Sequence, residues 1–136
     1  MKNIVIDANG AIVGRLGSYA AKELLIGNSV IIINSEEAII SGNRKDIVDR
    51  IIKWRKKGGS SQRGPKVSKL PDLLLKRMIR GMLPWDRPKG RAAWKRLRCY
   101  IKTGDLKESD LKNVLKLKND KPIKFISLKE IANLLK

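Results

Sequence analysis

The hydrophobic positions in the first part of the chain switch between two spacings. Residues 4–6 and 30–33 are short β-branched runs, which are typical of buried strands. Between them, apolar residues recur at every fourth position from Ile12 to Leu24. This spacing predicts an amphipathic helix over residues 12–26, which Gly27 closes.

The next segment adds a possible third strand and a second helix. Residues 38–40 are apolar, and the turn sequence Ser41-Gly42-Asn43 follows them. Asn43 can cap a helix whose apolar stripe runs from Ile47 to Ile52. Alternation of strands and helices at this spacing predicts right-handed crossovers and a small, mostly parallel sheet with helices on both faces.

Helical spacing returns after a basic segment that has no apolar periodicity. Pro71 suits the first position of a helix, and Pro84 is expected to end that helix. The face that we expect to be buried is apolar and consists of Leu74, Leu75, Met78, Ile79 and Met82.

Shorter signals follow. Residues 89–97 predict a short helix with Leu97 directed inward and Arg96 outward, and residues 99–101 predict the last strand of the sheet. Residues 103–124 are polar and rich in Lys and Asp. We therefore expect a surface segment there, with at most one turn of helix.

The end of the chain carries a helix start signal. Ser127 and Glu130 have the spacing of a capping box, ahead of a short apolar stripe that predicts a final helix. We therefore expect a single α/β domain. Its expected parts are a core over 1–102 with a basic loop at 56–70, a variable surface segment over 103–124, and a C-terminal helical extension over 125–136 that packs on the core.

Positive charge is concentrated in the middle of the chain. The protein has 31 Lys and Arg against 13 Asp and Glu, a net charge of +18. Residues 53–98 alone hold sixteen cations against two acids, a local net charge of +14 (16 − 2). Such a concentration repels itself and costs stability unless a polyanion is present. We interpret this surface as a nucleic-acid-binding one, with a solvated face or an anionic membrane surface as alternatives.

The composition excludes several kinds of chemistry. There is no histidine, the commonest general base and metal ligand, and the single cysteine excludes an intramolecular disulfide. No apolar run approaches the roughly twenty residues of a membrane-spanning helix, and the first residues lack a signal-peptide apolar region. We expect an intracellular protein with no cofactor and no metal site.

Four residues invite a catalytic interpretation and have a simpler one. Cys99, in a predicted strand, is interpreted as a small buried side chain. Asp7 follows a strand, but no partner carboxylate is near it in sequence, so turn formation is the better explanation. Glu36 and Glu37 could ligate magnesium, although two adjacent acids in a turn rarely do so alone.

A nucleotide-dependent enzyme of doubly wound fold, acting on RNA, is the rival interpretation. Gly10, Gly14 and Gly17 lie near a helix start, and an acidic residue follows the second strand, as in dinucleotide-binding proteins. The glycine spacing does not match that fingerprint, because Ile12 occupies the position where the pyrophosphate must approach. We interpret these glycines as sites of close helix–strand packing. Arg15, in the first turn of this helix, could still contact a phosphate.

The cations are expected to contact RNA in two ways. Arginine offers a planar fork for geometry-specific contacts, whereas lysine supplies general neutralisation. The three tryptophans, all in or beside the basic region, could act as stacking platforms or as core residues. The candidate RNA-binding residues are Arg15, Arg44, Lys45, Lys56, Lys57, Arg63, Lys66, Lys69, Arg77, Arg80, Arg87, Lys89, Arg91, Lys95 and Arg96.

Several short motifs, in one collinear order, resemble a known family. They are Ile6-Asp7-Ala8 with Gly14-Arg15-Leu16, Ile33-Asn34-Ser35-Glu36, Ile40-Ser41-Gly42-Asn43, Arg63-Gly64-Pro65, Arg80-Gly81-Met82-Leu83-Pro84, Gly90-Arg91 and Leu97-Arg98-Cys99-Tyr100. Together they resemble the universal large-subunit ribosomal protein L-thirteen in its archaeal and eukaryotic form. The tail from Phe125 to Ile131 resembles the archaeal C-terminal extension of that family.

The resemblance implies a three-layer α/β/α fold around a four-stranded, mainly parallel sheet. It also implies a non-enzymatic, cytoplasmic protein, present once per ribosome, that binds large-subunit rRNA, supports its assembly and contacts neighbouring ribosomal proteins. The segment 80–84 would then be both a helix end and RNA-facing.

Overall fold

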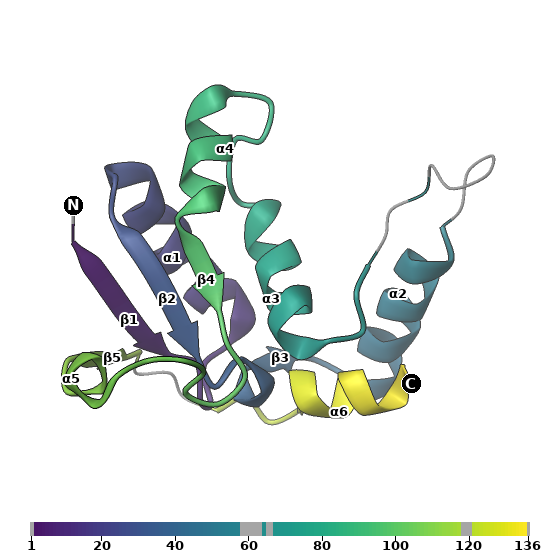
Figure 1. Ribbon diagram of the computed structural model, residues 1–136. Coiled ribbons are helices and arrows are strands. Elements are labelled where there is room, and N and C mark those ends of the chain that lie inside the picture. The colour runs from purple at the N-terminus through teal and green to yellow at the C-terminus, as the bar shows by residue number, and fades with distance from the viewer. Residues whose placement is uncertain (1, 58–63, 65–66, 118–120, 136) are drawn as a thin grey trace.

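The computed structural model describes residues 2–57, 64, 67–117 and 121–135, and Figure 1 shows its helices and strands. In chain order these elements are β1 (Asn3–Asp7), α1 (Val13–Ile26), β2 (Ser29–Ile33), the short 3-10 helix η1 (Ser35–Glu37), β3 (Ile39–Ser41), α2 (Arg44–Lys56), α3 (Pro71–Arg80), α4 (Pro88–Lys95), β4 (Leu97–Cys99), α5 (Glu108–Leu111), β5 (Val114–Lys116), β6 (Phe125–Ser127) and α6 (Leu128–Leu134).

A parallel four-stranded sheet in the order β4-β2-β1-β5 forms the centre of the molecule. Ile6 of β1 lies beside Ile32 of β2, and both side chains are fully buried. Ile32 in turn pairs with Cys99 of β4, and Ile6 with Leu115 of β5. The expected α/β class, with a small, mainly parallel sheet in one domain, is confirmed.

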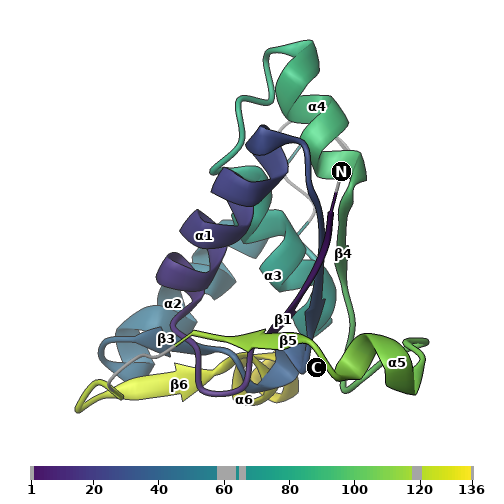
Figure 2. The same ribbon diagram turned by 90° about the vertical axis from the view of Figure 1, so that its left-hand side faces the viewer.

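The two faces of this sheet are covered differently. In Figure 2, which views the strands nearly edge-on, α1, α3 and α4 lie together on one side. The chain after β4 crosses the lower part of the other side and leads to α5 (Figures 1 and 2). The backbone N–H groups of Asn34 and Ser35 donate to the carbonyls of Lys102 and Tyr100, which ties this crossing segment to the strand ends. The layer on this side is thus a loop and a short helix.

Local capping explains where α1 ends and where α2 begins. Gly27, with a φ of +116°, lets the chain leave α1, and the N–H of Asn28 donates to the carbonyl of Glu23. The side chain of Asn43 accepts a hydrogen bond of 3.2 Å from the N–H of Lys45 and starts α2. Both ends agree with the sequence-based expectation.

Membership of the sheets differs from the prediction. Residues 38–40 were expected in the main sheet, but β3 pairs antiparallel with β6 in a separate two-stranded sheet. The fourth strand of the main sheet is β5, from the segment expected to hold at most one helical turn. Its position at the sheet edge leaves Leu115 and Lys116 exposed, so its sequence resembles a surface segment.

The last predicted strand begins two residues earlier than expected. The N–H of Val30 donates to the carbonyl of Arg96, so the ladder with β2 takes up the chain directly after α4. Leu97 is fully buried as predicted, but in β4 rather than in a helix. The side chain of Arg96 was expected to point outward, and instead its guanidinium donates a 2.6 Å hydrogen bond to the carbonyl of Leu24 at the end of α1. The same carbonyl accepts from the N–H of Gly27, so Arg96 adds a second, charged donor at the C-terminus of α1, where a cation is favourable.

Met82 was predicted to be buried, but the structure leaves it partly exposed. It remains 39% exposed, whereas the adjacent Leu83 is 5% exposed. Because α3 ends at Arg80, helical spacing no longer applies, and the turn directs Leu83 inward. Met82 instead covers Gly17 of α1, where a Cβ atom would lie 2.7 Å from the methionine sulfur. The close packing predicted for this glycine is therefore against a side chain of the turn after α3, not against a strand.

Candidate nucleic-acid interface

One face of α2 carries a row of cations beside an aromatic ring. Arg50, Lys53 and Lys57 are spaced by three and four residues, so they lie on one side of the helix and its C-terminal end. All three are exposed, and Trp54, one turn after Arg50, is half-buried against the core. The adjoining stripe, with Ile47 and Ile51 buried, anchors the helix.

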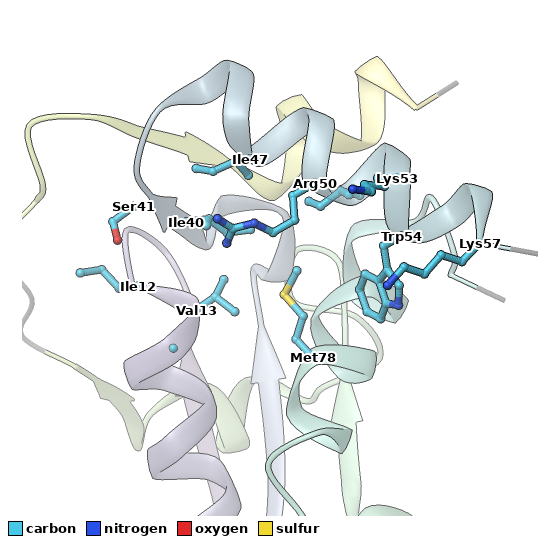
Figure 3. A pocket seen from close by; sticks show the side chains of 12 residues that line it. Ile12, Val13, Ile40, Ser41, Ile47, Arg50, Lys53, Trp54, Lys57 and Met78 are labelled. Carbon is cyan, nitrogen blue, oxygen red and sulfur yellow. The ribbon is translucent and has the colours of Figure 1, made fainter. Parts of the chain in front are cut away.

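A hollow of about 590 Å³ opens beneath this row. Its apolar wall is formed from four elements that are distant in sequence, by Ile12, Val13, Ile40, Ile47, Ile51, Trp54 and Met78. Figure 3 shows Arg50 extending from α2 toward Ile40, Met78 pointing up from α3, and Lys57 beside the Trp54 ring. The hollow therefore has an apolar floor and a cationic rim.

A second hollow adjoins the first. It is lined by Trp54 and Met78, which both hollows share, and by Arg77, Arg80, Gly81, Leu83 and Trp85. The Arg80 guanidinium carbon lies 4.0 Å from the centroid of the Trp85 ring. A cation over an aromatic face at this distance is held in place electrostatically. The end of α3 thus presents an oriented arginine beside an exposed tryptophan.

The cations of α4 form a further group next to this site. In Figure 1, α3 lies between α4 above and α2 to the right. The Trp94 ring of α4 meets Trp85 edge-on, with centroids 5.8 Å apart, and the Lys76 ammonium lies 4.9 Å from the Trp94 centroid. Contacts of this kind fix α4 relative to α3. The helix then exposes four predicted RNA-binding residues, Arg87, Lys89, Arg91 and Lys95.

The remaining candidates lie apart from these groups or outside the described residues. Arg15, Lys45, Lys56 and Lys69 are exposed. Arg44 forms an exposed ion pair of 3.8 Å with Glu130, so one cation of the set faces α6. Arg96, as described above, is engaged with the backbone of α1. Arg63 and Lys66 lie outside the described residues.

Sequence reasoning missed Arg50 and Lys53, which line the rim of the first hollow. The signal was present in the i, i+3, i+7 spacing of Arg50, Lys53 and Lys57, next to the apolar stripe of the same helix. It is weaker than the dense charge of the basic segment that follows α2. Of the tryptophans, Trp54 and Trp94 pack against the core, whereas Trp85 is 36% exposed; the role of a stacking platform for bases stays a prediction.

Two of the acids considered for catalysis, Asp7 and Glu36, have structural partners. The Asp7 carboxylate accepts hydrogen bonds from the backbone N–H of Asn9 and the side-chain amide of Asn34, as a turn former does. The buried Glu36 accepts from the N–H of Lys102, at 3.1 and 3.2 Å to its two oxygens. This contact holds the crossing segment and engages the Glu36 carboxylate.

The thiol of Cys99 is not activated. Burial raises its pKa from 9.0 to about 12, the nearby Lys76 ammonium lowers it by less, and Asp72 adds to the increase. Since the thiolate is the reactive form, this side chain is inert near neutral pH, as expected from the sequence.

Metal clusters and membrane-spanning helices are both absent from the described part of the chain. Its Cys, Asp and Glu side chains form no group of three or more that could hold a metal ion. Within the same residues, none of the helices combines the length and the apolar character needed to cross a membrane.

A small α/β domain with cations gathered around α2, α3 and α4, and with Asp7 and Glu36 in structural hydrogen bonds, defines a class of small, basic α/β proteins. The model of one family, described as "Ribosomal protein L13", matches residues 1–123. The chain belongs to this ribosomal protein family, as the sequence motifs predicted, and its members are structural rather than catalytic proteins.

Individual relatives agree with this assignment. The "Large ribosomal subunit protein uL13" of Archaeoglobus fulgidus is 36% identical over 135 residues, which cover 96% of this chain and 86% of the relative. The protein of the same name from Methanosarcina barkeri is 50% identical over 98 residues, 71% of this chain and 69% of the relative. That of Methanopyrus kandleri is 46% identical over 101 residues, so the match spans 73% of this chain and 62% of that relative.

Proposed function

We propose that this protein is a structural constituent of the large ribosomal subunit, where it binds large-subunit rRNA and supports assembly of the particle. One observation carries the proposal: of a net charge of +18, residues 53–98 contribute +14 (16 − 2), and cations of this region that lie on α2 and α3 line two adjoining hollows, while those of α4 are exposed nearby. A polyphosphate removes the repulsion among such charges.

The chemistry of the cations suggests how contacts divide. Of the arginines at the end of α3, Arg80 is held in position by its ring contact, and it suits geometry-specific contacts to phosphate or base. Exposed lysines such as Lys56 and Lys89 supply neutralisation that does not depend on sequence. Specificity then comes from RNA shape and 2′-hydroxyl contacts, because the deep groove of an RNA helix does not admit side chains.

The partners follow from this role. Besides large-subunit rRNA, the protein contacts neighbouring ribosomal proteins over a smaller area, is present once per ribosome, and works in the cytoplasm without a cofactor. The name of the relatives, a protein of the large ribosomal subunit, supports this placement.

Crosslinking in cells, followed by sequencing of the attached RNA, tests the proposal. The expected result is a small set of sites in large-subunit rRNA, with peptide crosslinks concentrated in α2, α3 and α4. A predominance of other RNAs, or large subunits from the native host that lack this chain, would contradict it. Micromolar, saturable binding of ATP or NAD in equilibrium dialysis would instead revive the enzymatic interpretation.

A further inference from the structure

The hollow beneath α2 is built for a ligand with two chemical parts. Its floor is apolar and includes the ring of Trp54. Arg50, Lys53 and Lys57 lie around its rim. Its volume of about 590 Å³ lies in the range of small-ligand sites, roughly 300–1,000 Å³. A purely apolar ligand would leave the rim unused, and a bare anion would leave the floor exposed.

We propose that this hollow receives one unstacked nucleotide of the bound RNA, with its base on the apolar floor beside Trp54 and its phosphate at Arg50 and Lys53. The inference rests on the proposed function and names the structural form of RNA recognised at one point of that interface. Proteins that recognise single-stranded RNA commonly stack a splayed base on an aromatic side chain while cations hold the backbone.

Continuity with the second hollow favours a nucleic acid over an acidic peptide. The two hollows meet at Trp54 and Met78, and the second has its own cations, Arg77 and Arg80, next to the Trp85 ring. The pattern of ring, cation and apolar floor therefore repeats along the groove. A nucleotide chain repeats base and phosphate in the same way, whereas a peptide would need acidic and apolar side chains at matched intervals.

Gly14 allows the hollow to be filled without changing its charge or its wall. This glycine lines the hollow from the first turn of α1, and a Cβ atom added there meets no other atom within 4 Å. Gly14→Leu therefore adds a side chain in open space, and Gly14→Ala is the matched control that leaves most of the hollow free. A circular-dichroism melt of each variant verifies that the fold is retained.

The assay is fluorescence anisotropy with labelled twelve-nucleotide strands of adenosine or uridine and with a twelve-base-pair RNA duplex. We expect Gly14→Leu to weaken single-strand binding by about 5- to 150-fold, the range that stacking of one base supplies. Duplex binding should change less than twofold, and Gly14→Ala should behave as the unaltered protein. Tryptophan quenching by the single strand should shrink in Trp54→Phe.

A rim variant tests the phosphate half independently. Arg50→Gln with Lys53→Gln should reduce the salt dependence of single-strand binding, by about 0.7 in the logarithmic slope for each phosphate that the variant no longer binds. The matched control is Lys107→Gln with Lys112→Gln, exposed cations flanking α5 on the other side of the sheet, and it should leave the slope unchanged (Figure 2).

Equal single-strand affinity of Gly14→Leu and the unaltered protein would overturn the inference. So would stronger Trp54 quenching by a twelve-residue peptide of alternating Glu and Leu than by either RNA strand, since it would assign the hollow to a protein partner. In both cases the unaltered protein would still bind rRNA in a salt-dependent way. Loss of that binding in the unaltered protein would instead mark failure of the proposed function.

Discussion

Gly90→Ala is the substitution whose effect the structure defines most sharply. Gly90 is buried in the first turn of α4, where a Cβ atom would overlap the carbonyl group of Pro84 and lie 3.0 Å from Cγ of that proline. The obstacle is backbone, held by a 3.0 Å hydrogen bond from the N–H of Arg87 to the same carbonyl. It cannot move aside as a flexible side chain would, so α4 or the turn before it must shift.

The magnitude follows from two opposing effects. Overpacking of a well-packed site costs about 1–3 kcal/mol, and an obstacle of backbone favours the upper part of that range. Exchange of Gly for Ala in a helix returns about 0.5–1 kcal/mol. We therefore expect a net loss of about 1–2 kcal/mol in the free energy of unfolding, and a fall in Tm of roughly 3–10 °C for a domain of this size.

Urea denaturation and thermal melting, both followed by circular dichroism, measure this loss. Gly14→Ala is the matched control, because it is an exposed helical glycine whose added Cβ has open space. We expect it to leave stability unchanged or raise it by about 0.4–1 kcal/mol. If Gly90→Ala were as stable as Gly14→Ala, the close contact between α4 and the Pro84 turn would be wrong, and so would the placement of the cations on α4.

Three further predictions concern the core, the thiol and the basic segment. Leu83→Ala should lower the free energy of unfolding, measured by urea denaturation, by about 2–4 kcal/mol, and Met82→Ala by less than half of that, since only Leu83 is buried. Equal losses would contradict the conformation of the turn after α3. Because burial raises the pKa of Cys99 to about 12, iodoacetamide at pH 8 should alkylate this thiol roughly 10³-fold more slowly in the native than in the urea-unfolded protein. For the same reason the free energy of unfolding should fall as the pH rises from 9.0 toward 12. Fast alkylation of the native protein would refute the burial of the thiol. Joint replacement of Arg63, Lys66 and Lys69 by Ser should weaken rRNA affinity but leave Tm nearly unchanged. A large fall in Tm would reveal a structural role of the basic segment.

The parts of the fold that were predictable are those with strong local signals. Residues 12–26 combine helical spacing with a terminal glycine, and α1 spans Val13–Ile26 with Gly27 in the left-handed conformation. The strands at 4–6 and 30–33 are continuous β-branched runs, and both lie at the centre of the sheet. In these segments local preference and tertiary packing agree, so the sequence pattern alone was sufficient.

The parts that were not predictable depend on contacts between distant segments. β5 is three residues long, and only its pairing with β1, more than a hundred positions earlier, makes it a strand. β3 was recognised as a strand, but its partner β6 could not be, because antiparallel pairing across about 85 residues leaves no local trace. The inward turn of Arg96 likewise depends on the end of α1, 72 residues earlier.

The candidate interface was predictable in composition but not in shape. The charge count located it on residues 53–98, and the exposed cations of α4 were all named from sequence. The hollow beneath α2 was not foreseeable, because its wall combines Ile12, Ile40, Trp54 and Met78 from four separate elements. Such a site exists only once the chain has folded.

The most direct test of the central claim is the salt dependence of binding to deproteinised large-subunit rRNA. The account predicts that cations around α2, α3 and α4 engage six to ten phosphates. The association constant should then fall by roughly 10³–10⁵ between 50 and 200 mM KCl. An affinity that stayed constant over this range, or an rRNA affinity no greater than that for an unrelated RNA of equal length, would contradict the account.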